Sequence, residues 1–447
     1  MERYIQELLA QIRCKQAHEL VRREIQTHIE EQICENMVDG MEREEAVEAA
    51  IRDMGDPVET GVELDKIHRP RIEWKLILAV AFISLCSVAI RYFVARDCQA
   101  YNSYSLLEDV LTVGMGLALM GIIYRLDYSV IGYYAKAIGA VFCIGFLIII
   151  FSATVVNGSR MYMHLGTVTF SPILLLYLYV PVYGAILFQY RKCGKIGLWQ
   201  SILWIVIPVC LAYLASNGSQ AGAMGVTLSI LLSIAVWKSW FQVSRKKFLI
   251  CYWMILLLLP LLAVGLSVNV PFLAKSFHME TQTYVEYFSG KTYVIQELME
   301  KILSGSAWIG RTNLENLRPL PSAIHAHILV SITAYYGSLA AVLAVGLLIL
   351  LTGKIFSVSK HQKNQLGKMM GYGCGFVFFN MIFSNVAMNM GVTTKLYGDL
   401  PFLSASGSTM LISYVFIGLV LSIYRYQNIL PATLGARKRL KIKIEKV

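Results

Sequence analysis

Apolar segments long enough to cross a bilayer recur along most of this 447-residue chain and constrain its fold more than any other feature. The hydrocarbon core needs roughly 20 apolar residues per helix, and backbone polar groups there must be satisfied internally. A composition that is 56% hydrophobic and 15% charged excludes an ordinary water-soluble surface. We therefore predict an all-α, polytopic membrane protein with about ten transmembrane helices. The predicted spans are residues 76–94, 110–124, 132–153, 172–190, 199–215, 220–237, 248–266, 327–352, 368–388 and 403–424.

Lysine and arginine gather before the first predicted span, in the connections at 191–198, 238–247 and 353–367, and after the last span, and cytoplasmic loops carry this excess. The pattern predicts that both termini are cytoplasmic and that a long, neutral loop at 267–326 faces outside. The net charge of +11 belongs to the cytoplasmic loops, so nucleic-acid binding is not expected. Two cations within spans, Arg91 and Lys136, are expected to snorkel to the lipid headgroups.

Residues 1–70 differ from the rest of the chain because they are acidic and polar. Apolar residues at helical spacing, with stop signals at Gly40 and at Gly55-Asp56-Pro57, predict four short helices. This small soluble helical domain resembles the acidic prefix domain found ahead of permease-like proteins. We predict that it docks a cytoplasmic partner, ahead of a membrane domain at 71–426 and a basic cytoplasmic tail at 427–447.

The stretch from Asn385 to Thr409 combines Gly, Pro, Ser and Thr just before the last predicted span. Polar backbone at membrane depth normally lines a protein cavity, which marks the stretch as a candidate site. It resembles a signature segment of the FtsW/RodA/SpoVE family, also called the SEDS proteins. The matching residues are Asn385, Gly391, Leu400, Pro401, Phe402, Ser404, Gly407 and Ser408.

A second resemblance to this family lies in the predicted outer loop after the third span. The segment Asn157-Gly158-Ser159-Arg160 matches the start of a family motif, and Phe170-Ser171-Pro172 matches its continuation. The motif's glutamate and lysine are replaced by Leu174 and Tyr177. The resemblance covers the membrane part, from about residue 76 to residue 426, and leaves out the acidic domain.

The resemblance implies a peptidoglycan glycosyltransferase of the bacterial cytoplasmic membrane. Such enzymes polymerise lipid II, the undecaprenyl-linked disaccharide-pentapeptide, usually beside a class B penicillin-binding protein. The family's essential carboxylate would take a proton from the attacking sugar hydroxyl, but the aligned residue here is Ala326. His327 is a candidate replacement base because a neutral imidazole titrates near physiological pH, and Glu315 is a more distant candidate.

Five residues are candidates for substrate binding: Arg160, Asn157, Ser404, Ser408 and Asn385. The guanidinium of Arg160 suits a diphosphate, whereas Asn385 either contacts substrate or forms a hydrogen bond between helices. The histidines of the outer segments lack metal-ligand spacing. We therefore predict no metal site and no cofactor, with a divalent cation as the alternative that stays open.

Three functional classes follow from these observations. The first is an active polymerase with a relocated base, and the second is a member that binds the lipid-linked precursor without catalysing its polymerisation. The third is a non-enzymatic scaffold or a permease, which the scarcity of carboxylates in the spans disfavours. We favour a divergent SEDS protein of cell-envelope synthesis, cell division or cell shape, in which the loss of the carboxylate at Ala326 puts catalysis in doubt.

Overall fold

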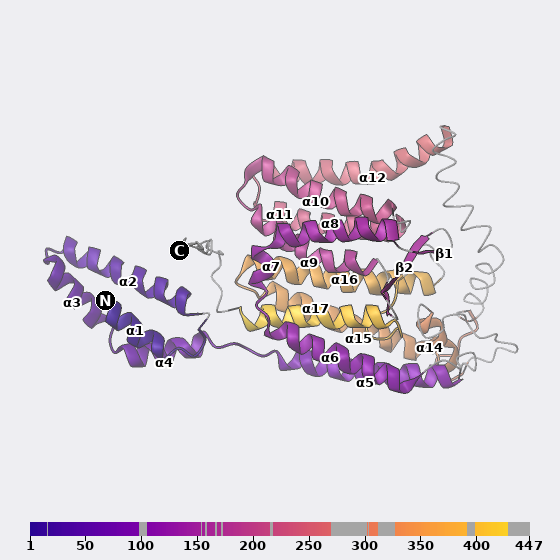
Figure 1. Cartoon of the computed structure of the whole chain (residues 1–447), viewed down its shortest axis with the longest axis horizontal. Helices are drawn as coiled ribbons and strands as arrows, with labels where there is room; N and C mark the ends of the chain where they lie inside the picture. The colour runs from indigo at the N-terminus through magenta and orange to yellow at the C-terminus, as the bar shows by residue number, and fades with distance from the viewer. Residues whose placement is uncertain are drawn as a thin grey trace, which may run out of the picture.

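The structure is a computed structural model. It describes residues 1–15, 17–97, 105–152, 154–156, 159–165, 168–170, 173–214, 218–269, 302, 304–311, 327–390 and 398–427. Within these residues, an acidic helical segment is followed by a bundle of long helices (Figure 1).

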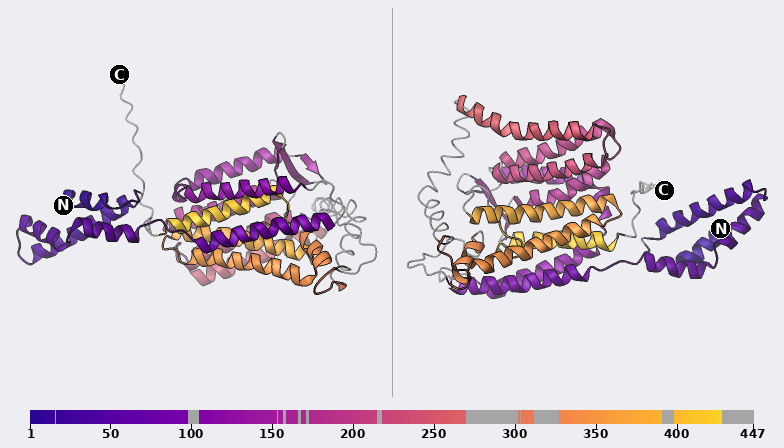
Figure 2. Two further views of the ribbon diagram at one scale, coloured as in Figure 1. Left: turned by 90° about the horizontal axis from the view of Figure 1, so that it is seen from below. Right: turned by 180° about the vertical axis from the view of Figure 1, so that it is seen from behind.

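The bundle consists of apolar helices that run alternately in opposite directions (Figures 1 and 2). Its helices are α5 (Trp74–Asp97), α6 (Leu106–Arg125), α7 (Ser129–Tyr133), α8 (Ala135–Ser152), α9 (Ile173–Gln189), α10 (Gly194–Leu214), α11 (Gly218–Trp237), α12 (Arg245–Asn269), α14 (Ile328–Tyr336), α15 (Ser338–Lys360), α16 (Gln365–Asn389) and α17 (Gly407–Arg425). In the described residues, seven helices are long and apolar enough to cross a membrane. Each predicted span overlaps a helix, so the prediction of a helical, multi-pass membrane protein is confirmed.

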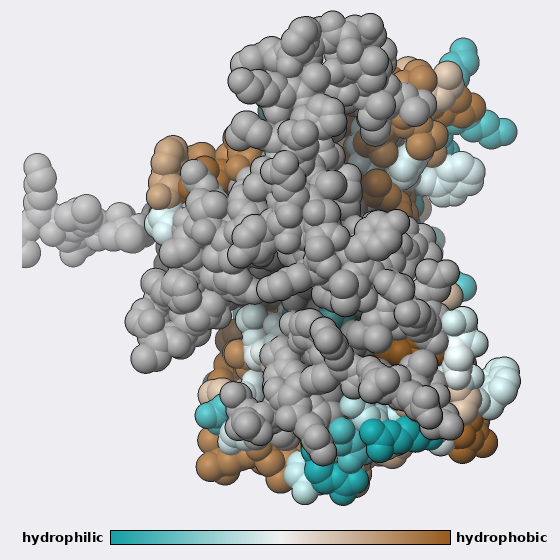
Figure 3. Space-filling model, turned by 90° about the vertical axis from the view of Figure 1, so that its right-hand side faces the viewer, coloured by the Kyte–Doolittle hydropathy of each residue, from teal (hydrophilic) through white to brown (hydrophobic). Residues whose placement is uncertain are grey.

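Two ends of the bundle are used as references below. The head end holds Trp74 of α5 and Arg425 of α17, and the loop end holds α14 (Figure 1). At the loop end, the described residues around the rim include both apolar and hydrophilic side chains (Figure 3).

The predicted span at 327–352 is wrong in its limits. The chain breaks at Gly337, whose φ of 93° separates the short helix α14 from the long helix α15. A Cβ atom at this position would lie 2.6 Å from the carbonyl oxygen of Trp308. Two backbone hydrogen bonds join the same two segments. Ser338 N donates to Ala307 O at 3.0 Å, and Leu339 N donates to Trp308 O at 3.1 Å. The long apolar helix is therefore residues 338–360, because a second segment of the chain packs against the break.

A small antiparallel sheet lies between α8 and α9, in the segment that the sequence predicted only as a loop. Its strands are β1 (Thr154–Val156), β2 (Ser159–Leu165) and β3 (Val168–Phe170), in the order β1-β2-β3. The β-branched and aromatic residues of this segment favour strands. The sheet is a local addition to a molecule that is otherwise helical.

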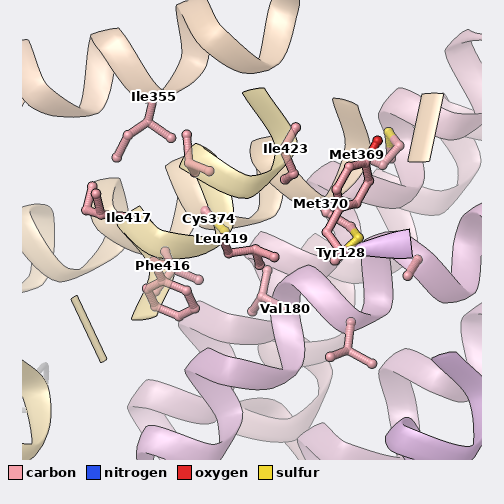
Figure 4. Packing of buried hydrophobic residues seen from close by; sticks show 14 of the residues in the cluster. Tyr128, Val180, Ile355, Met369, Met370, Cys374, Phe416, Ile417, Leu419 and Ile423 are labelled. Atoms are coloured by element: carbon pink, nitrogen blue, oxygen red, sulfur yellow. The ribbon is translucent and has the colours of Figure 1, made fainter. Parts of the chain in front are cut away.

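Helices α16 and α17 form the centre of the bundle. About two-thirds of the apolar part of α16 (67%) and 72% of that of α17 are buried, compared with 17% for α6. Buried side chains from α9, α15, α16 and α17 interlock there (Figure 4). Lipid tails are as apolar as these side chains, so close packing rather than water exclusion stabilises the arrangement.

A close approach between α6 and α17 illustrates this packing. A Cβ atom at Gly116 would lie 2.1 Å from the ring of Tyr414, so only glycine leaves room for the ring. The Tyr414 hydroxyl in turn lies 2.6 Å from the Ser84 hydroxyl on α5. Three helices are thereby fixed around one tyrosine.

The acidic segment contains α1 (Glu2–Ala10), α2 (His18–Val38), α3 (Arg43–Asp53) and α4 (Pro57–Ile67). Four helices therefore form where the sequence predicted them. Asp65 of α4 is 3% exposed, and its carboxylate accepts from Arg13 N at 3.0 Å and from Arg69 Nε at 2.9 Å. The backbone hydrogen bond from Arg13 and the charges of both arginines hold the pKa of Asp65 below its usual value, against the opposing effect of burial.

Candidate functional site

Residues 398–406, which lead into α17 at the loop end, form a tight and mostly buried turn. We call residues 399–406 the Pro-Phe turn. The backbone N–H of Leu400 donates to Ser404 Oγ at 2.9 Å, and Ser404 N donates back to Leu400 O at 3.2 Å. Phe402, at the apex, has a φ of 63°, a left-handed conformation that costs energy in a residue with a Cβ atom. The surrounding structure must therefore hold the turn in place.

Arg91 of α5 holds the Pro-Phe turn from one side. Its side chain is fully buried, and Nη1 donates to the carbonyl oxygen of Phe402 and, at 3.3 Å, to that of Leu403. Its Nε donates to Asp109 Oδ2 of α6 at 2.9 Å. The expectation that Arg91 snorkels to the headgroups is therefore wrong, because the guanidinium is fully buried and donates from Nε and Nη1 to a carboxylate and two carbonyl oxygens within the bundle.

Asn385 of α16 holds Gly398, the residue just before the Pro-Phe turn. Its side chain is fully buried, and Nδ2 donates to the carbonyl oxygen of Gly398 at 2.5 Å. One turn further along α16, Asn389 donates to Asn385 O at 2.8 Å and accepts from the backbone N–H of Val330 at 3.3 Å. A chain of amide hydrogen bonds thus runs from Gly398, next to the Pro-Phe turn, to α14.

The polar residues of the Pro-Phe turn lead into the first turn of α17. Thr409 Oγ1 donates to the half-buried carboxylate of Asp399 at 3.0 Å, and Ser406 Oγ donates to Thr409 Oγ1 at 3.2 Å. Ser408, a predicted binding residue, is half-buried in the same first turn. The N-terminus of a helix favours negative charge, so this end of α17 suits the carboxylate of Asp399.

His327, the candidate base, precedes the first residue of α14. It is half-buried, its carbonyl oxygen accepts from Ser331 N at 3.1 Å, and its Nδ1 has no hydrogen-bond partner within the described residues. Burial lowers the pKa of His327 to about 4. The imidazole is therefore neutral at pH 7, but it is a weak base for general-base catalysis.

The other predicted site residues are only partly placed. Ala326, Glu315 and Asn157 lie outside the described residues. Arg160 lies on β2, where its Cα is paired with that of Val155 on β1. Among the described residues, no group of three or more His, Cys, Asp or Glu side chains could hold a metal ion.

Sequence reasoning missed the pairing of Arg91 with Asp109. The signal for it is a pair of opposite charges near the facing ends of two consecutive apolar segments. A charge in the hydrocarbon region is expensive unless it is partnered. An arginine and an aspartate at similar depth on adjacent helices would therefore have indicated an ion pair inside the bundle.

Known proteins resemble the membrane part of this chain. Residues 70–429 match the sequence model of the FtsW/RodA/SpoVE family, described as a cell cycle protein. The probable peptidoglycan glycosyltransferase FtsW of Coxiella burnetii is 24% identical over 371 residues, which cover 78% of this chain and 95% of that protein. The protein of the same name from Alcanivorax borkumensis is 24% identical over 380 residues, which cover 79% and 92%.

Solved structures show the same fold. A chain of a peptidoglycan synthase complex aligns with a TM-score of 0.63 at 18% identity, covering 80% of this chain and 99% of that one. The rod shape determining protein RodA of Thermus thermophilus aligns with a TM-score of 0.55 at 17% identity, covering 80% and 97%. Because the family match spans the whole bundle and the fold agrees with it, this multi-pass membrane protein belongs to the FtsW/RodA/SpoVE family.

Proposed function

We propose that this protein acts in bacterial cell-envelope synthesis by binding lipid II, the undecaprenyl-linked disaccharide-peptide, at the loop end of its bundle. The names of its relatives and the family match support the substrate class. The observation that carries the proposal is the Pro-Phe turn, held by Arg91 at Phe402 and by Asn385 at the adjoining Gly398. Such a preorganised polar segment at membrane depth is suited to a phosphate-bearing lipid headgroup, with Arg160 and Ser408 as its contacts.

The proposal does not include polymerisation by this protein alone. Ala326 stands where the family's catalytic carboxylate is expected, and its methyl group transfers no proton. Leu174 and Tyr177 replace two further charged residues of the family pattern. A histidine whose pKa is about 4 supplies little basicity at pH 7. We infer that the protein works with a partner synthase, such as a class B penicillin-binding protein.

The test uses the purified full chain with fluorescent lipid II, measuring both binding and the formation of glycan strands. We expect binding without strands. Arg160→Gln should weaken binding, whereas Arg245→Gln, which removes an equal charge at the head end, should not. Absence of binding by the unaltered chain would refute the proposal.

A relocated catalytic base is the second candidate function, and one observation favours it. His327 Nδ1 is buried and has no partner within the described part of the chain, so a substrate hydroxyl could occupy that position. Strand formation that is lost in His327→Ala but kept in His361→Ala would establish this alternative. His361 is a suitable control because its Nδ1 hydrogen-bonds Ser357 O at the other end of the bundle.

We also propose that the head end of the bundle faces the cytoplasm and that residues 1–70 recruit a cytoplasmic partner. The support is the excess of Lys and Arg in the connections at that end and the acidity of the first segment. Labelling of single cysteines introduced at Lys246 and at Trp308 with an impermeant reagent tests the orientation. We expect only the cysteine at position 308 to react in intact cells.

A further inference from the structure

A cavity of about 440 Å³ lies at the head end of the bundle, opposite to the proposed lipid II site. It is formed by the residues just before α5, the last turns of α15 with the connection that follows, and the end of α17. The side chains that give it its chemistry are Arg71, Glu73, Lys354, His361, Lys363 and Tyr424. Neither the Pro-Phe turn nor α14 contributes a residue to it.

The cavity has an excess of positive charge. Lys354 Nζ lies 2.6 Å from Glu73 Oε1, so these two charges cancel. Burial disfavours the charged form of Glu73, but hydrogen bonds from Lys354 and Tyr424 outweigh it and hold the pKa of Glu73 below its usual value. Arg71 and Lys363 are exposed and have no ion-pair partner among the residues that the structure describes. Two unmatched cations therefore face the opening.

Hydrogen bonds fix two parts of the cavity wall. Arg71 N donates to the carbonyl oxygen of Arg425 at 3.4 Å, which ties the entry to α5 to the end of α17. His361 Nδ1 donates to Ser357 O at 2.7 Å, which holds the ring against the last turn of α15. Arginine and lysine are donors that suit phosphate oxygens.

From the cavity toward the loop end, α5 and α15 carry exposed apolar side chains. On α5, Trp74 is followed by Leu78, which is 64% exposed, and Phe82. On α15, which contacts α5, Leu350 precedes Lys354 by one helical turn and is 72% exposed. A tryptophan and a lysine at the ends of apolar stripes are typical of the bilayer interface. A ligand in this cavity would therefore have its charged part in water and its apolar part against the two helices.

We infer that this cavity binds the phosphate headgroup of an anionic membrane lipid whose acyl chains lie along α5 and α15. The phosphate would contact Arg71 and Lys363. Basic pockets between transmembrane helices recognise anionic headgroups in this way. The inference is independent of lipid II binding, which is proposed for the other end of the bundle.

Native mass spectrometry of the purified full chain tests this inference. The chain is mixed with equal amounts of phosphatidylglycerol and phosphatidylcholine, and the lipids retained after gentle removal of detergent are counted. We expect the protein to retain one phosphatidylglycerol molecule in preference to phosphatidylcholine. The double variant Arg71→Gln/Lys363→Gln should lower this preference roughly tenfold or more, since each interfacial cation contributes about 1 kcal/mol.

Two matched variants make the result specific. Lys246→Gln/Lys247→Gln removes two exposed cations at the same end of the bundle, on α12, and should leave the preference unchanged. Arg71→Lys/Lys363→Arg keeps both charges and should retain the lipid. Equal retention by the wild type and by Arg71→Gln/Lys363→Gln would overturn the inference, as would equal losses in both Gln variants.

Two further outcomes would assign the cavity to a different ligand. If inorganic phosphate protects the cavity from lysine-reactive labels while phosphatidylglycerol does not, the ligand is a soluble anion. If a photo-crosslinker at position 361 couples to acidic residues 1–70 in the native membrane, the cavity binds protein. Crosslinking to lipid instead supports the inference.

Discussion

Arg91 shows how one residue connects the periphery of the bundle to its central turn. A charge at membrane depth loses its hydration, and only close partners compensate for that loss. Arg91 has a carboxylate on α6 and two carbonyl oxygens on the Pro-Phe turn. The guanidinium donates to Asp109 and to the Pro-Phe turn from different nitrogens, whereas the single ammonium group of a lysine would reach only one of these partners.

We expect Arg91→Met to lower the free energy of unfolding in detergent by about 3–5 kcal/mol, because it leaves Asp109 buried without this cation. Arg96→Met is the matched control on the same helix. Its ion pair with Asp97 is exposed and should be worth at most about 1 kcal/mol. Exchanging the charges, with Arg91→Asp and Asp109→Arg together, should not restore stability. Equal losses for Arg91→Met and Arg96→Met would contradict this account.

His327 predicts a pH dependence of stability. Its pKa is about 4 in the folded protein and near 6.5 when the chain is unfolded. As the pH falls below 6.5, the unfolded chain binds a proton that the folded chain does not, so stability decreases by at most about 1.4 kcal/mol per pH unit until pH 4. Unfolding measured between pH 7 and pH 5 should therefore show a decline that His327→Asn removes. An unchanged decline in the variant would exclude His327 as its origin.

At the scale of elements, the break between α14 and α15 determines where a long apolar segment becomes a membrane-spanning helix. The positive φ of Gly337 turns the chain, and the backbone of Ala307 and Trp308 fills the space beside it. The short helix α14 is thereby free to pack against α16 through Asn389. The break positions His327 and Val330 independently of the long span.

We expect Gly337→Ala to destabilise the protein by more than about 1 kcal/mol, from the strained φ and the contact with Trp308 O. Gly346→Ala, within α15, is the control because no atom lies within 4 Å of its Cβ position. That change should be neutral or stabilising by up to about 1 kcal/mol, since alanine favours helices. Thermal unfolding of both variants measures the difference, and similar melting temperatures would contradict the role given to Gly337.

The helices were predictable from the sequence because the bilayer imposes their length and apolar character. The limits of α15 were not, because a single glycine inside an apolar run does not reveal which distant segment packs against it. The residue types of the Pro-Phe turn marked it as a candidate site, but they did not reveal that Arg91 holds it. Arg91 lies more than three hundred residues away in the chain, and only the fold brings it to Phe402.

At the scale of the whole molecule, the acidic segment and the bundle are stabilised differently. The segment at 1–70 has its own buried apolar residues, including Ile5 and Leu8, and its own buried carboxylate, Asp65. The bundle has its core between α9, α15, α16 and α17. Each part therefore buries apolar residues of its own.

We expect deletion of residues 1–70 to leave the melting temperature of the remaining chain within about 2 °C of the full-length value, because the core of the bundle is unchanged. Partners that co-purify with the full chain from native membranes should be lost. Asp65→Asn, which weakens the acidic segment alone, is a milder second variant. Retention of the same partners by the deleted chain would disprove the proposed recruiting role.

The central position of α16 and α17 also bears on how the protein is made. Among the described helices these two are synthesised last, so the earlier spans enter the bilayer before the core that they surround exists. Arg91 must cross into the membrane long before Phe402 is synthesised. Asp109 follows Arg91 by only 18 residues and neutralises it within the α5–α6 hairpin. The ion pair thus neutralises Arg91 during membrane insertion, and Arg91 later binds the Pro-Phe turn.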